Sequence, residues 1–291
     1  MVQAQAQLSQ PLVTWEPLPA DYSLPDDPVE NIRQPPLAAA LTDALDAAQR
    51  IQPDMLIGSN FGLVANIRGK TVVKAPDWFY VPKVYPIDPQ VVRRSYTQHL
   101  EGDPVSVVME FLSAEDNSEL SLRSTPPYGK LYFYEQILQV PTYVIYDTAE
   151  ATLEVRCLRN QGYILQTPTA EGRVWIPELE LFLGVWYGER LAQPINWLRW
   201  WDTDGNLLLW SAEEAEQERQ RAEQAQQQAE QERQRAEQAQ QQAEQERQRA
   251  EQEQLRAEQE RQRAEQEQLR ANRLEAYLRS QGIDPDQLPD G

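Results

Sequence analysis

The 291-residue chain contains only one cysteine, Cys157, and one histidine, His99. A disulfide framework needs several cysteines, and structural zinc sites are built mainly from Cys and His, so the composition excludes both. His99 is also the only histidine that could serve a Ser-His-Asp or Cys-His mechanism. Its segment "SYTQHLEGDP" is polar and turn-like, which indicates a surface histidine, whereas "LEVRCLR" indicates a small core cysteine in a strand.

Long apolar runs are also missing. No run approaches the roughly 18 residues that a membrane span requires. The first residues, "MVQAQAQLSQ", lack the basic and apolar regions of a secretory signal. We therefore expect no membrane association and a cytoplasmic location.

Basic residues are few: 27 Lys and Arg stand against 46 Asp and Glu, for a formal net charge of −19. Residues 211–291 hold 20 acidic and 12 basic residues, and residues 1–210 hold 26 and 15. Strong nucleic-acid surfaces carry a net basic footprint. Neither part has one, so any DNA contact would have to use a local basic groove.

Composition divides the chain into four segments. Residues 1–36 contain seven prolines and predict an extended arm. Residues 37–210 alternate apolar runs with turn signals and predict a mixed α/β body of one sheet with few helices. Charged heptad repeats predict a long helix over 211–272, and residues 273–291 are expected to form a short docking segment.

Within the body, apolar residues at helical spacing predict helices over 37–51 and 127–139. The run "DMLIGSNFGLVANIRGKTVVKAPDWFYVPKV" predicts two or three strands with a tight turn at "RGK". Hairpins are expected to turn at 160–162 and at Asp204-Gly205.

The tail repeats a 14-residue unit, "AEQERQRAEQAQQQ" twice and then "AEQERQRAEQEQLR" twice, with Ala every seven residues from Ala215 to Ala271. Ala, Glu, Gln and Arg are strong helix formers, and about 65 such residues make a rod on the order of 100 Å long. A dimerising coiled coil prefers Leu, Ile or Val at its seam. Both a solvated single helix and a weak Ala-seam coiled coil therefore fit, and a homodimer or a protein partner through this helix stays open.

One carboxylate lies within an apolar strand, Glu110 in "SVVMEFLS". Burying a carboxylate is costly unless a cation pairs with it or its pKa rises. Asp77 begins the strand "DWFYV", and Lys130 lies early in the helix that follows Glu110, with Tyr134 one turn later on the same face. If the two strands are adjacent, Asp77 and Glu110 bring their oxygens together at one end of the sheet.

Paired carboxylates suit a hard cation such as Mg²⁺ or Mn²⁺, which keeps waters and meets phosphate oxygens. A lysine beside them would orient a water or stabilise charge on a phosphate. Asp77 and Glu110 are thus candidate metal ligands, with Lys130 as a candidate catalytic residue. The alternatives are a turn-forming Asp77, a Glu110 facing solvent on an edge strand, and a solvated Lys130. Glu30 and Asp147 are further acids that could join the site.

Taken together, "PDWFYV", "VVMEFLS" and "YGKLYFYEQILQVPTYVIYD" resemble the Uma-two endonuclease family of the PD-(D/E)XK nuclease superfamily. The similarity covers roughly residues 50–190. It implies a restriction-endonuclease-like fold, a mixed central sheet flanked by helices, with Asp77 and Glu110 as metal ligands and Lys130 as the catalytic lysine. The superfamily places its lysine two residues after the acid, where this chain has Leu112, so a lysine on the helix must substitute.

Two functions follow from these observations. The first is a Mg²⁺- or Mn²⁺-dependent endonuclease that hydrolyses phosphodiester bonds of DNA. The second is a non-catalytic scaffold on a degenerate nuclease fold, with the helical tail binding a partner. The acidic body favours the scaffold, and the Asp77, Glu110 and Lys130 set favours the enzyme.

Overall fold

The computed structural model describes residues 12–19, 22, 32–88, 90–112, 123–160 and 162–282. The chain divides into two units, Met1–Glu216 and Gln217–Gly291. Most of the proline-rich arm lies outside the described residues. Of its described part, β1 (Val13–Thr14) pairs with a strand of the body, and the Trp15 ring lies 5.2 Å from that of His99.

A mixed sheet of six strands runs through the body in the order β10-β9-β8-β7-β5-β2. Its strands are β2 (Leu56–Gly58), β5 (Trp78–Val81), β7 (Val107–Leu112), β8 (Thr142–Asp147), β9 (Thr152–Arg159) and β10 (Gly162–Leu165). Only β7 and β8 of this sheet run parallel, and the connection between two parallel strands must cross over from one end of the sheet to the other. The expected mixed α/β architecture is confirmed.

Two smaller sheets accompany the central one, so the expectation of a single sheet is wrong. One consists of β1, β3 (Gly62–Ile67), β4 (Lys70–Lys74) and β6 (Ser95–Tyr96), and the other of β11 (Val174–Ile176), β12 (Leu181–Arg190) and β13 (Gln193–Trp201). The segment expected to hold two or three strands holds four, β2 to β5. The β3–β4 hairpin bonds to β1 and β6 instead of extending the central sheet. Apolar alternation marks a strand but does not choose its partner.

The described residues of the body also form the helical elements α1 (Gln34–Ala47), α2 (Lys130–Tyr132) and the π-helix η2 (Phe133–Leu138) that continues α2. Helix α1 starts with prolines in its first turn, where a missing N–H costs nothing, and buries Leu37, Leu41 and Leu45. It ends before the expected residue 51 because Gln49 adopts a left-handed conformation with φ of 55°.

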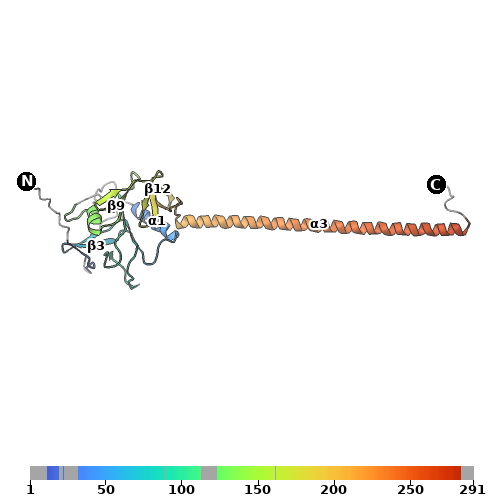
Figure 1. The fold of residues 1–291 in the computed structure, drawn as a ribbon, viewed down its shortest axis with the longest axis horizontal. Coiled ribbons are helices and arrows are strands. Elements are labelled where there is room, and N and C mark those ends of the chain that lie inside the picture. Colours follow the sequence, from blue (N-terminus) through green and yellow to red (C-terminus); the bar gives the residue numbers. More distant parts are fainter. Residues whose placement is uncertain are drawn as a thin grey trace, which may run out of the picture. The chain divides into compact units, whose positions relative to one another are not determined.

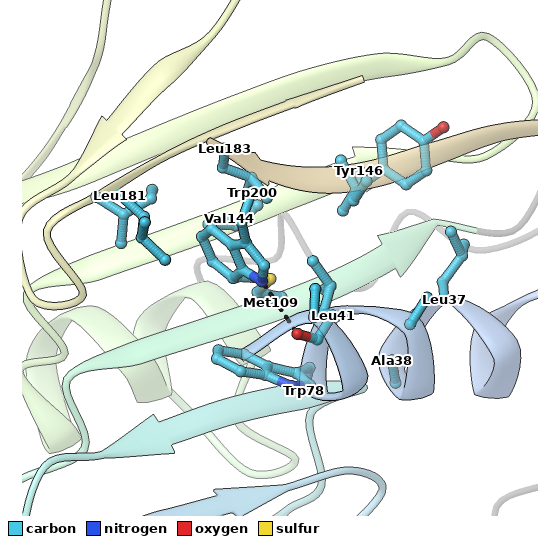
Figure 2. Packing of buried hydrophobic residues seen from close by; sticks show 14 of the residues in the cluster. Leu37, Ala38, Leu41, Trp78, Met109, Val144, Tyr146, Leu181, Leu183 and Trp200 are labelled. Atoms are coloured by element: carbon cyan, nitrogen blue, oxygen red, sulfur yellow. Dashed lines mark hydrogen bonds between the residues drawn. The ribbon is translucent and has the colours of Figure 1, made fainter. Parts of the chain in front are cut away.

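The two faces of the central sheet pack against different layers. On β7, Val107, Met109 and Phe111 face a core that includes α1 and strands β12 and β13. Figure 2 shows this core, where the Trp200 indole N–H donates to the Leu41 carbonyl oxygen at 3.1 Å. Val108 belongs to the core on the opposite face, which includes α2 and η2. Because side chains alternate along a strand, Glu110 lies on that second face.

The hairpin predicted at 160–162 is present, whereas at Asp204-Gly205 the structure has a turn whose two arms meet in the isolated bridge of Trp201 and Leu207, with no second strand among the described residues. Strands β9 and β10 pair with Arg159 opposite Gly162, and the turn after β13 is closed by the Asp202 carboxylate, which accepts N–H donors from Asp204 and Asn206. Asx-type side-chain bonds of this kind are why Asp and Asn favour turns.

The tail forms a single 70-residue helix, α3 (Ser211–Ser280), drawn uninterrupted in Figure 1, and it buries none of its residues. Residues 273–280, expected to belong to a separate docking segment, continue this helix, and residues beyond 282 lie outside the described part. None of the helices in the described part combines the length and apolar character needed to cross a membrane.

The first turn of α3 is bonded to the body through a buried arginine. The Arg199 side chain is fully buried, and its two terminal nitrogens bond the Glu213 carboxylate at 3.1 and 2.6 Å. Its guanidinium lies 3.4 Å from the centre of the Trp210 ring, and Glu213 also accepts the Trp210 N–H at 2.8 Å. Burial lowers the pKa of Arg199, while Glu213 opposes this change. A single carboxylate thus neutralises the buried cation.

We predict that Glu213→Gln lowers the free energy of unfolding by about 2–4 kcal/mol, because it leaves the buried guanidinium without a counter-charge. Chemical denaturation of the full chain, followed by tryptophan fluorescence, measures this loss. Glu214→Gln is the matched control: Glu214 is exposed in the same helical turn, so this variant has the same change in charge near the helix dipole and should change stability by less than about 0.5 kcal/mol. Equal losses in both variants would contradict the role given to the ion pair.

Candidate active site

Glu110 lies in the middle of the body and is only 1% exposed. Strand β7 carries it between Met109 and Phe111, which are buried on the other face of the sheet. Since β7 is an interior strand with β5 on one side and β8 on the other, the alternative of an edge-strand Glu110 facing solvent is excluded. The carboxylate must therefore be satisfied by protein groups, by a cation or by a proton.

Asp77 comes directly before β5 and reaches the same position from the neighbouring strand. Strands β5 and β7 pair antiparallel with Trp78 opposite Met109, so Asp77 lies across from Glu110. One oxygen of the Asp77 carboxylate, Oδ2, accepts the backbone N–H of Phe111 at 2.6 Å. The condition set by the sequence, that the two strands be adjacent, is met.

Lys130 and Tyr134 approach Glu110 from the helical segment above this face. The Lys130 Nζ atom lies 3.1 Å from Glu110 Oε2, and the Tyr134 hydroxyl donates to Glu110 Oε1 at 2.7 Å. Lys130 is the first residue of α2, and four residues further on Tyr134 presents its side chain on the same face. The Lys130 side chain is 23% exposed, whereas Tyr134 is fully buried.

The electrostatic balance at Glu110 is set mainly by burial. The pKa of the Glu110 carboxyl is raised to about 7, with desolvation as the main cause; the charge of Asp77 also raises it, while Lys130 and the Tyr134 hydrogen bond lower it. Burial and the adjacent Glu110 charge raise the pKa of Tyr134 well above its usual value. Tyr134 therefore keeps its proton and acts as a hydrogen-bond donor to Glu110.

The donor set suits a hard cation with a small number of protein ligands. Asp77 and Glu110 supply carboxylate oxygens, and their mutual repulsion, expressed in the raised Glu110 pKa, would be relieved by a positive ion. Within the described residues, no group of three or more Asp, Glu, His or Cys side chains converges as a metal site. Two carboxylates completed by waters and substrate oxygens form the typical environment of Mg²⁺.

Asp147, a further acid considered from the sequence, does not join this cluster. The Asp147 Oδ1 atom accepts the N–H groups of Ala149 and Glu150, so it closes the turn after β8. Glu30 lies outside the described residues. Sequence reasoning placed Tyr134 on the same face as Lys130 but did not predict its hydrogen bond to Glu110. The spacing of four residues between Lys130 and Tyr134 is the sequence signal that could have pointed to this hydrogen bond.

The cluster lies within a segment that matches a known protein family. A family model described as "Uma2: Putative restriction endonuclease" matches residues 25–192, more than half of the chain. The chain belongs to the Uma2 family. The Uma2 match includes Asp77, Glu110, Lys130 and Tyr134, and it begins before the segment on which the resemblance was recognised. No curated protein matches the chain.

The raised Glu110 pKa predicts a definite dependence of stability on pH when divalent metal is removed by a chelator. Between about pH 4.5 and pH 7 the unfolded chain loses the Glu110 proton while the folded chain retains it, so the free energy of unfolding falls as pH rises through this window. Relative to Glu110→Gln, the stability of the native chain should fall by about 3 kcal/mol across the window. Denaturant unfolding of both proteins at a series of pH values measures the difference.

Asp77→Asn tests the cause of this shift. The variant removes a charge that raises the Glu110 pKa, so the fall in stability should move to lower pH in this background. The native chain and Glu110→Gln could instead differ in free energy of unfolding by the same amount at every pH in the window. Glu110 would then be ionised throughout, and the assigned pKa would be wrong.

Proposed function

We propose that this Uma2 chain is a metal-dependent endonuclease that hydrolyses phosphodiester bonds of DNA. The observation that carries the proposal is the position of Asp77 and Lys130 around the buried carboxylate of Glu110. Asp77 comes from the strand next to β7, and Lys130 comes from a helix. Membership in a restriction-endonuclease family supports the reaction class. The partly exposed Lys130 ammonium supports access of a phosphate to the cluster.

In this proposal Asp77 and Glu110 hold Mg²⁺ or Mn²⁺. When bound, the metal would polarise the phosphoryl group and lower the pKa of a coordinated water. The Phe111 N–H orients the Asp77 carboxylate, and the Tyr134 hydroxyl orients that of Glu110. These two bonds fix the ligands before any ion arrives, which lowers the cost of organising the site.

Lys130 has a separate task. Its ammonium stabilises negative charge that develops on the phosphate or orients the attacking water, as a preorganised donor does without moving during the reaction. It also offsets part of the cost of burying Glu110, because it stands 3.1 Å from that carboxylate. Arrival of a metal would weaken the need for this ion pair and leave Lys130 available to substrate.

A non-catalytic scaffold is the second candidate, and two observations favour it. Residues 1–210 hold 26 acidic and 15 basic residues, which opposes approach of a polyanion. In addition, Lys130 and Tyr134 already provide both Glu110 oxygens with partners, so burial of Glu110 does not by itself demand a metal. On this reading the cluster is an internal ion pair.

A cleavage assay separates the candidates. We expect the purified chain to nick plasmid or single-stranded DNA with Mg²⁺ or Mn²⁺, and Asp77→Asn, Glu110→Gln and Lys130→Met each to lower the rate by about 100-fold or more. Asp46→Asn and Lys70→Met are matched controls, because both residues are exposed, Asp46 belongs to α1, which packs on the opposite face of the central sheet, and Lys70 belongs to β4 of a smaller sheet. Circular dichroism confirms that each variant is folded. Cleavage that persists in all three site variants would remove the proposed roles.

Metal binding is tested independently of cleavage. Mg²⁺ or Mn²⁺ should raise the midpoint of thermal unfolding of the native chain in a concentration-dependent way, because a ligand that binds only the folded state stabilises it. The rise should disappear in Asp77→Asn and remain in Asp46→Asn. Absence of any metal-induced shift in the native chain, together with absence of cleavage, would leave the scaffold as the function.

A further inference from the structure

The charge pattern of α3 has a regularity that pairing within a single helix does not require. If Ala215 is position a of a heptad, Ala occupies every a position to Ala271, and position d and position e lie at about 50° on either side of this line at coiled-coil geometry. Arg occurs at e in residues 219, 233, 247 and 261, and each is preceded by a Glu at d; residues 253 and 267 are further glutamates at d, beside Gln at e. Basic and acidic side chains thus flank the Ala line on opposite sides and at matching heights.

We infer that α3 is an interface with a second copy of this chain, in which two α3 helices pair parallel and in register. In a parallel pair related by a twofold axis along the helices, position e of one copy faces position d of the other. Arg233, for example, then faces the second copy's residue at position 232, a glutamate. The same match recurs at both later e-position arginines, so the charges of the two copies are complementary along the seam.

Antiparallel pairing fails this test. Its twofold axis is perpendicular to the helices, so e faces e and d faces d, which brings Arg toward Arg and Glu toward Glu where they coincide. In a parallel pair shifted by one heptad, Arg233 at e faces Ala225 or Ala239 at d and loses its glutamate partner. Glu232 at d then faces Gln226 or Gln240 at e and loses its arginine partner. Charge therefore favours one orientation and, over 225–247, one register.

The end of the helix supports the same frame independently of charge. Leu274 falls at position d and Leu278 at position a of the heptads that begin at Ala215. Leu274 is 60% exposed on α3, and neither leucine is buried in the described structure. A parallel, in-register pair brings Leu278 opposite its own counterpart on the line of the alanines, while Leu274 at d faces position e of the second copy, where the chain has Glu275.

Pairs within one helix compete with this interface but do not replace it. Arg233 lies 3.6 Å from Glu237 one turn later, with both side chains more than 60% exposed. Exposed pairs of this kind contribute little, so Arg233 can exchange such a contact for one across the seam at small cost. Because the seam is lined by Ala over most of its length, we expect a weak dimer that dissociates on dilution and at high salt.

Thiol cross-linking of the full chain tests orientation and register. Ala236→Cys and Ala264→Cys place a thiol on the seam at two heights, and a short thiol-specific cross-linker should give covalent dimers of both variants. Gln234→Cys and Gln262→Cys place thiols on the opposite side of the helix, at position f, and should give none. The native chain controls for Cys157, which is buried. Cross-linking at only one seam height, or equally at the f positions, would overturn the proposal, because only parallel in-register helices meet their own residue at two heights.

Charge reversal tests the cause of pairing. Reversing the three arginines at 233, 247 and 261 to Glu should convert the dimer to monomer in sedimentation experiments, and adding Glu232→Arg, Glu246→Arg and Glu260→Arg to that variant should restore it. Circular dichroism checks that each variant stays helical. A native chain that sediments as a monomer up to its solubility limit, or a reversal without effect, would overturn the proposal. Neither outcome bears on metal-dependent cleavage, which is measured separately.

Discussion

The body is organised around the desolvated carboxylate of Glu110. An apolar strand with neighbours on both sides cannot hold a carboxylate without compensation, and the compensation comes from elements far apart in the sequence. Strand β5 must lie beside β7 to bring Asp77 to this position, and the α2–η2 segment must cover that face to supply Lys130 and Tyr134. The sheet order and the helical crossover are therefore both conditions for the site.

Lys130 and Tyr134 offset only part of the cost of burying the Glu110 carboxylate. Lys130 and Tyr134 favour the ionised carboxylate, yet burial and the charge of Asp77 leave the Glu110 pKa near 7. A fully satisfied internal ion pair would hold its acid well below this value. A carboxylate poised near neutrality gains most from an additional positive charge, which is the property expected of a metal ligand awaiting its ion. The same property makes the cluster a poor device for stability alone.

The sequence was most informative where local chemistry decides the structure. Turn residues predicted the β9–β10 hairpin and the turn at Asp204-Gly205, an apolar run placed Glu110 in a strand, and the spacing of Lys130 and Tyr134 predicted a shared helical face. Strand partners were harder to predict, because the apolar residues of β3 and β4 indicate strands without naming their neighbours. The bond from the Phe111 N–H to Asp77 was also beyond prediction, since it depends on the register between β5 and β7. Long-range pairing, not residue type, separates what could be predicted from what could not.

The tail presents the opposite situation, because every relevant contact is local or lies between copies. Glu, Gln, Arg and Ala support a helix whether or not a second helix is present, so helix formation says nothing about pairing. A single helix and a paired helix differ in what they require of the positions of charged and apolar residues around the helix axis. A solitary helix gains from Arg and Glu at i,i+4 in any rotational position, whereas a seam also requires charges of opposite sign on its two sides and apolar residues in line with the alanines. Arg233 on one side of the Ala line, Glu232 on the other side and Leu278 in line with the alanines satisfy that stricter requirement together, and this arrangement supports the proposed pairing.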